Sequence, residues 1–205
     1  MKNTNIFSQY ALLSLFCGLS PLNHADDTIA DPVEQSPEKQ TNYILGLALT
    51  TGGDELAKVL LVDEYGDRST KKIEAGGLIY FYGGMQLNNF VFPLRFILGY
   101  LTDRVDASNG SVSFSRFPVE ISALHTAGPH AFGIGLSYHL SPELDMSDAG
   151  LDSYKADDAL GWLLMYEYSL ESNVSIGVRY TNISYDFGGE DVDGSNAGVS
   201  LNIKF

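Results

Sequence analysis

The stretch "SNAGVSLNIKF", from Ser195 to Phe205, decides the fold class that we expect for this chain. Side chains of a β-strand point alternately to two faces, so every second residue lies on the same face. One face carries Ala197, Val199, Leu201, Ile203 and Phe205, and the other carries Gly198, Ser200, Asn202 and Lys204. A strand with one wholly apolar face that ends on an aromatic residue is typical of a membrane β-barrel, whose outer face contacts lipid.

Seven further segments have the same period of two, which gives eight strands in all. They are 43–50, 73–87, 92–100, 116–123, 131–140, 160–170 and 174–181. In most of them a large apolar face opposes a face of Gly, Ser and Thr with a few charges. The segment 116–123, for example, sets Phe117, Val119 and Ile121 against Arg116 and Glu120. Around Leu78 to Tyr82 the phase of the alternation is ambiguous.

The polar connections between these strands alternate in length. Long ones are expected at 51–72, 102–113, 141–158 and 187–196, and short ones at 88–89, 127–130 and 171–173. An even number of antiparallel strands, with short turns at one end and long loops at the other, indicates an outer-membrane barrel with periplasmic turns. A soluble sandwich or lipocalin-like barrel is the alternative, but it would place its apolar residues inside and its charges outside.

Composition narrows the function classes. The chain has 26 acidic against 12 basic residues, a net charge of -14, which disfavours nucleic acid as a partner. Its single cysteine excludes an intramolecular disulfide. Apart from the N-terminus, no stretch approaches the ~20 apolar residues of a membrane-spanning helix.

The N-terminus has the pattern of an export signal. Residues 1–25 are expected to be a signal peptide cut after Ala25, with a cut after Ala30 as the alternative. Cys17 follows Phe16 instead of the small residue that a lipoprotein signal requires, so we do not expect lipidation. Residues 26–41 are polar and are expected to form a flexible periplasmic tail.

Residues 42–205 resemble the small eight-stranded outer-membrane barrels of the OmpA/OmpX-like superfamily, most clearly in "GVRYTNISYDF" and "VDGSNAGVSLNIKF" near the end of the chain. The resemblance implies an all-β, eight-stranded antiparallel up-and-down transmembrane β-barrel in the outer membrane of a Gram-negative bacterium. It also implies that the barrel-assembly machinery reads Phe205 as an assembly signal. The expected partners are outer-membrane lipids and lipopolysaccharide, and we expect a monomer without a cofactor.

Four charged residues from different strands fall on interior faces: Arg95, Glu120, Glu167 and Arg179. Each lies roughly four to seven residues from a short turn, so strand geometry places them in one approximate layer. Buried charges persist only in pairs, because an isolated one carries a heavy desolvation cost. The layer is therefore either a satisfied polar core that closes the barrel or a narrow path for ions.

His139 and Ser141 have the spacing of the His-x-Ser pair of lipid A deacylases, which are barrels of similar size. A serine activated by a histidine is a sound nucleophile. Alternation, however, turns both residues inward, where lipid cannot reach them, and the expected downstream glutamate is missing from the loop.

Asp191 and Asp193 have the oxygen spacing of a calcium turn without a complete calcium loop, so a metal site is a weak candidate.

The first loop is more basic, and Arg68, Lys71 and Lys72 could reach lipopolysaccharide phosphates.

Three functions follow from the observations on the whole sequence. The favoured one is a non-enzymatic barrel with a structural or surface-interaction role. The alternatives are a narrow, porin-like channel for ions or small solutes and a lipid A-modifying acyl hydrolase.

The role of Phe205 can be tested directly. Deleting Phe205 is expected to reduce assembly far more than removing an outer loop, because the aromatic residue sits where the strand meets the interface. The measurement is the fraction of heat-modifiable barrel in outer-membrane preparations. Equal assembly of the two deletions would contradict the assigned role.

Overall fold

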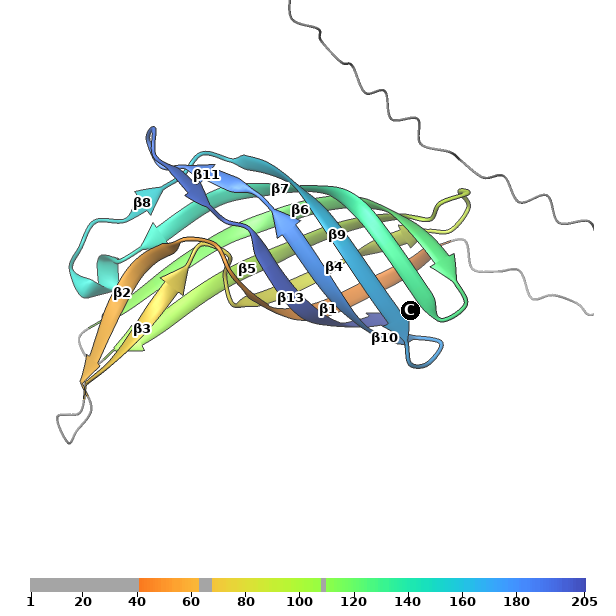
Figure 1. Cartoon of the computed structure of the whole chain (residues 1–205), viewed down its shortest axis with the longest axis horizontal. Helices are drawn as coiled ribbons and strands as arrows, with labels where there is room; N and C mark the ends of the chain where they lie inside the picture. The colour runs from red at the N-terminus through yellow and green to blue at the C-terminus, as the bar shows by residue number, and fades with distance from the viewer. Residues whose placement is uncertain (1–40, 63–67, 108–109) are drawn as a thin grey trace, which may run out of the picture. The chain divides into compact units, whose positions relative to one another are not determined.

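A computed structural model describes residues 41–62, 68–107 and 110–205. Within these ranges, eight strands form a closed antiparallel barrel: β1 (Thr41–Thr51), β4 (Ile79–Leu87), β5 (Leu94–Ala107), β6 (Gly110–Ala127), β7 (His130–Asp145), β9 (Ala159–Ser169), β10 (Val174–Asn182) and β13 (Asn196–Lys204). Each strand pairs with the next one around the wall, β1 also pairs with β13, and pairing of β6 with β7 completes the ring (Figure 1). The predicted fold class is confirmed. The predicted signal peptide and all but the last residue of the predicted tail lie outside the described residues.

Shorter elements extend the wall at one end. They are β2 (Glu55–Val62), β3 (Arg68–Glu74), β8 (Tyr154–Lys155), β11 (Ser184–Asp186), β12 (Asp191–Asp193) and the 3-10 helix η1 (Ser147–Ala149). The pairs β2–β3 and β11–β12 form two-stranded sheets. The expectation of a long loop at 102–113 was wrong, because β5 and β6 continue as a hairpin through most of it. The polar residues of that segment alternate with buried Val105 and Val112, so a strand suits them.

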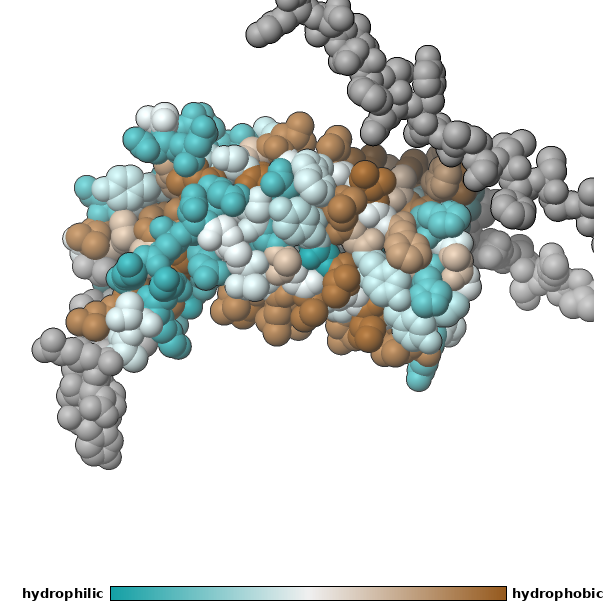
Figure 2. Space-filling model, in the orientation of Figure 1, coloured by the Kyte–Doolittle hydropathy of each residue, from teal (hydrophilic) through white to brown (hydrophobic). Residues whose placement is uncertain are grey.

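The side chains of the barrel wall point alternately outward and inward, as the sequence predicted. Outward positions carry large apolar side chains that are exposed to the surroundings, such as Leu98, Ile134 and Val178. Inward positions are buried and largely polar or small. Figure 2 shows hydrophilic residues gathered over β2, β3 and β11, and hydrophobic ones toward the short turns. This is the reverse of a soluble barrel, so the soluble alternative does not fit.

The structure also settles the phase of β4. Tyr80 and Tyr82 are buried and point inward, whereas Phe81 is exposed. Tyr82 fits because Gly46 lies opposite on β1, where a Cβ atom would come within 2.2 Å of the tyrosine ring. The tyrosine thus fills the space that the missing side chain leaves.

A β-bulge interrupts β7 near its outer end. The pairing with β6 shifts between Ser115 and Phe117, and Ser141 has a positive φ of 49°. The extra residue reverses the alternation, so His139 is buried while Ser141 is exposed and Pro142 is buried again. The prediction that Ser141 points inward was wrong for this reason, since an uninterrupted strand was assumed.

The extensions beyond the wall pack around a hydrophobic cluster of their own. Its buried members are Ile73, Ala75, Val105, Val112, Phe114, Leu144, Ala156, Ala159, Ile183 and Tyr185. We call this set the cap cluster. Leu56 and Val59 of β2, and Phe187 between β11 and β12, pack against it. The outer segments therefore form a folded layer at this end of the barrel and not separate solvated loops. Among the described residues, no helix is long and apolar enough to cross a membrane.

Adjacent glycines on β4 provide a test of the wall. A Cβ atom at Gly84 would lie 1.9 Å from the Phe96 carbonyl oxygen on β5, whereas at Gly83 it would meet first the flexible Leu45 side chain at 3.2 Å. Gly84→Ala is therefore expected to lower the folded fraction several-fold, and Gly83→Ala to leave it nearly unchanged. Heat-modifiable gel migration after refolding into vesicles measures both. Similar yields for the two variants would show that the β4–β5 contact is not tight.

Candidate functional site: the barrel interior

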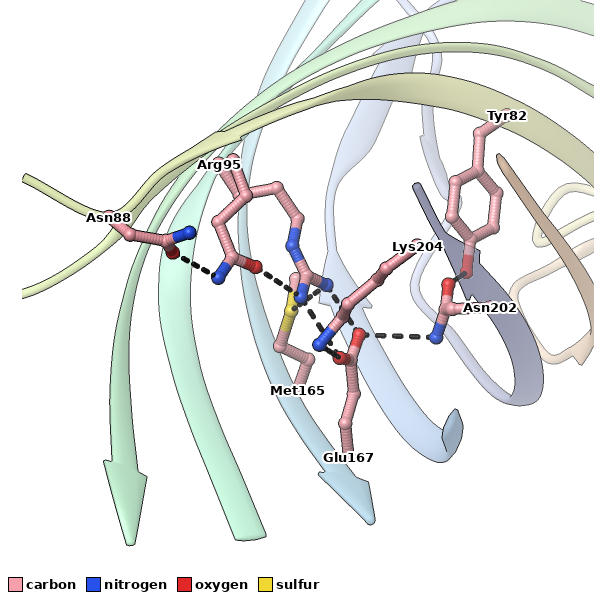
Figure 3. A network of polar contacts seen from close by, with 8 residues as sticks. Tyr82, Asn88, Arg95, Met165, Glu167, Asn202 and Lys204 are labelled. Carbon is pink, nitrogen blue, oxygen red and sulfur yellow. Dashed lines mark hydrogen bonds and ion pairs between the residues drawn. The ribbon is translucent and has the colours of Figure 1, made fainter. Parts of the chain in front are cut away.

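The first interior ion pair joins strands β5 and β9. The Arg95 guanidinium donates two hydrogen bonds to the Glu167 carboxylate, one of them 2.9 Å long. Arg95 also donates to Gln86 Oε1 at 3.0 Å, and Asn202 Nδ2 donates to Glu167 at 3.2 Å (Figure 3). The Tyr82 hydroxyl in turn donates to Asn202 Oδ1 at 2.5 Å. One network thus spans the lumen from β4 and β5 to β9 and β13.

A second ion pair joins β10 to β6. Arg179 donates to Glu120 at 2.5 Å, and both side chains are almost completely buried. The Arg179 guanidinium also lies 4.7 Å from the centre of the Tyr80 ring, a cation–π distance. All four charged residues that the sequence placed in the lumen line one cavity of about 10 Å³. That volume is at the lower limit for a single water molecule.

His139 belongs to a chain of hydrogen bonds above the second pair. Its Nε2 lies 3.0 Å from the Ser137 hydroxyl, which donates to Glu120 at 3.3 Å, and its Nδ1 lies 2.6 Å from the Tyr185 hydroxyl. Both ring nitrogens therefore have partners other than Ser141. The backbone N–H of Ser141 donates to Asp158 at 2.8 Å on the exposed side. The structure does not bring His139 and Ser141 together as a nucleophile and its base.

Arg116 is an interior cation that was not among the four predicted lumen charges. Its side chain is 0% exposed, and its guanidinium lies 4.6 Å from the Phe114 ring centre and 5.7 Å from that of Tyr185. Arg116 shares the inward face of β6 with Glu120, four residues away, and this spacing could have identified it. It joins the polar interior to the cap cluster.

The remaining predicted residues lie at the two ends of the barrel. Asp191 and Asp193 are exposed on β12, and the hydroxyl and backbone N–H of Ser195 lower the pKa of Asp193. In the described part of the chain, no three His, Cys, Asp or Glu side chains are grouped to hold a metal ion. Phe205 is exposed and exchanges backbone hydrogen bonds with Tyr43 at 2.9 and 3.2 Å.

The basic hairpin of the first loop is partly neutralised. Lys58 and Lys72 form ion pairs with Glu55 at 2.9 and 2.7 Å. A hydrogen bond from Lys72, and to a smaller extent one from Lys58, holds the pKa of the Glu55 carboxyl below its usual value. Lys71 is exposed on β3, and the side chain of Arg68 lies outside the described residues. One of the three predicted phosphate-binding side chains is therefore already engaged.

Comparison of the fold with solved structures finds small outer-membrane proteins among the matches. The attachment invasion locus protein Ail of Yersinia pestis, in complex with the heparin analogue sucrose octasulfate, matches with a TM-score of 0.50, 10% identity and coverage of 80% of this chain and 97% of Ail. The chain has the fold of the small outer-membrane barrels. Neisserial surface protein A matches at a TM-score of 0.48 and 13% identity over 82% of this chain and 98% of its own.

The outer membrane protein OprG from Pseudomonas aeruginosa matches with a TM-score of 0.44 and 16% identity, over 81% of this chain and 96% of OprG. No protein-family model matches the sequence, and no curated protein matches it. The resemblance to small eight-stranded barrels that the sequence suggested is confirmed at the level of fold. At these identities the comparisons say nothing about ligands of this chain.

The second ion pair gives a quantitative test. Arg179→Met leaves Glu120 buried without its cation, and Glu120→Gln leaves Arg179 without its anion, so each is expected to destabilise the barrel by about 3–5 kcal/mol. The double variant should cost less than the sum, because neither charge is then left alone. Urea unfolding in lipid vesicles measures all three.

The control for this cycle is an exposed pair. Lys155 lies 3.7 Å from Glu143 and its side chain is 73% exposed, so Lys155→Met should change stability by less than about 1 kcal/mol. Strictly additive effects of Arg179→Met and Glu120→Gln would show that the interior pair is not coupled.

Proposed function

We propose that this protein is an integral barrel of a Gram-negative outer membrane, with a closed interior and a non-enzymatic structural or surface-interaction role at its extracellular end. The observation that carries the proposal is the filled lumen. Two buried ion pairs surround a cavity of about 10 Å³, and the cap cluster closes the outer end above them. Eight-stranded barrels leave just enough interior for side chains.

The lipid-exposed wall supports the membrane placement. Outward residues along the strands are large and apolar, as in Leu45, Leu98 and Ile176. Transferring this surface to water would expose a contiguous apolar band far larger than soluble monomers tolerate. Outer-membrane lipids are therefore the proposed surroundings of a monomeric barrel, and the assembly machinery its proposed partner during insertion, with Phe205 as the signal.

The extracellular end is acidic. Exposed carboxylates gather at the end of β7, on the β7–β9 connection and on β11 and β12: Asp145, Asp148, Asp152, Asp157, Asp158, Asp186, Asp191 and Asp193. A surface of this sign repels polyanions and attracts cationic partners. We therefore propose that this barrel does not share the sulfated ligand seen with Ail. Exposed Lys71 remains the candidate for a lipopolysaccharide phosphate.

The two alternative functions have less support. A channel requires a continuous path, whereas the interior pairs and the cap cluster fill the lumen in the described residues. An acyl hydrolase requires an activated serine that lipid can reach. Here His139 is hydrogen-bonded to Ser137 and Tyr185. Ser137 is completely buried, so lipid cannot reach the serine that contacts the histidine.

Planar-bilayer recordings test the closed interior. The refolded barrel and its Glu120→Gln/Glu167→Gln variant are both expected to show no discrete openings, because neither change removes side-chain volume from the lumen. Membrane fractionation and heat-modifiable migration establish that each sample is inserted and folded. Discrete currents in the wild type that change in the variant would identify a channel with Glu120 and Glu167 at its gate.

A further inference from the structure

We propose that a groove on the lipid-facing wall near the short turns binds one phospholipid of the periplasmic leaflet, with an acyl chain in the groove and the phosphate at His125. This inference rests on the membrane placement proposed above. It adds a specific lipid site to a surface that otherwise contacts lipid in general.

The groove has a volume of about 540 Å³ and crosses three neighbouring strands. Ala123 of β6, Ile134 of β7 and Leu164 of β9 are paired side by side along its floor. Ala123 contributes only a methyl group where its neighbours in the row carry large side chains, which makes the wall locally hollow. The volume falls within the ~300–1,000 Å³ typical of small-molecule sites.

The neighbouring turn points to lipid as the occupant. The β4–β5 connection "NNFVFP" (88–93) exposes three consecutive large apolar residues: Phe90 at 50%, Val91 at 93% and Phe92 at 54%. Phe92 lines the groove, and its ring centre lies 6.4 Å from that of His125. The apolar turn and the groove are thus continuous with the lipid-facing wall, as expected for a turn that dips into the interface.

His125 provides the polar end of the site. It is exposed on β6, three residues before Gly128 of the short turn, so it lies ~10 Å from that end of the barrel. An imidazole N–H at this depth can donate to a phosphate oxygen. The described segments 88–94 and 121–136 contain no Asp or Glu that would repel the phosphate.

A second groove shows why this one is singled out. It has a volume of about 480 Å³ and lies between Leu47, Tyr168 and Val199. Its lining residues include neither His nor Lys nor Arg, and the adjacent His130 is already paired through Nδ1 with the Tyr166 hydroxyl at 2.9 Å. We therefore expect ordinary lipid contacts there and a retained lipid at the groove beside His125.

Native mass spectrometry of the refolded full chain tests the site, with 1-palmitoyl-2-oleoyl-phosphatidylglycerol as the probe and Kdo2-lipid A in a parallel series. Ala123→Phe fills the groove and should lower retention of the phospholipid about tenfold or more. His125→Ala should lower it by roughly tenfold, through loss of a hydrogen bond to a charged group. Ala197→Phe makes the same change at an outward position of β13 outside both grooves and should leave retention unchanged.

Each outcome separates the groove from the membrane placement. The proposed site is overturned if Ala123→Phe and Ala197→Phe retain the same amount of phospholipid. It is also overturned if Ala123→Phe lowers the retention of Kdo2-lipid A and not that of the phospholipid. A wild-type barrel that is heat-modifiable but retains no lipid overturns the groove alone. A chain that never becomes heat-modifiable overturns the membrane placement as well.

Discussion

Backbone hydrogen bonding is the constraint on which the rest of this structure depends. Lipid offers no partner for an N–H or a C=O group, so every strand of the wall needs a neighbour on each side. The pairings of β1 with β13 and of β6 with β7 meet this requirement by leaving no free edge in the ring. Once the ring closes at eight strands, its interior is too narrow to remain empty.

The narrow interior explains the chemistry found inside. Polar side chains must face inward because the outer positions face lipid, and charges in so small a volume need partners. Arg95 with Glu167 and Arg179 with Glu120 provide them across the lumen. Arg116 is accommodated differently, against the rings of Phe114 and Tyr185. The interior therefore combines these charges with a small apolar cluster that includes Tyr80, Tyr82 and Ile97, while the larger hydrophobic cluster is the cap cluster.

Much of this architecture follows from alternation alone. The period of two predicted the eight strands, their outward faces and the inward position of Arg95, Glu120, Glu167 and Arg179. It failed at Ser141, because β7 has one more residue than β6 at the bulge, and the alternation pattern does not show where such an extra residue falls. It also could not show which charges pair, since partners lie on strands that are far apart in sequence, as Arg95 and Glu167 are. The cap cluster was missed because its members are scattered among polar residues of six short stretches, at 73–75, 105, 112–114, 144, 156–159 and 183–185.

The cap cluster has a consequence for how this end of the barrel withstands proteases. Proteases cleave chain segments that can leave their packed positions, and the segment that carries Tyr185 is held by a buried ring and a 2.6 Å hydrogen bond to His139. Residues 180–203 contain no Lys or Arg, so trypsin does not probe this segment, whereas a non-specific protease meets a packed chain there. Survival of the segment in a surface-shaving experiment would then reflect packing and not location.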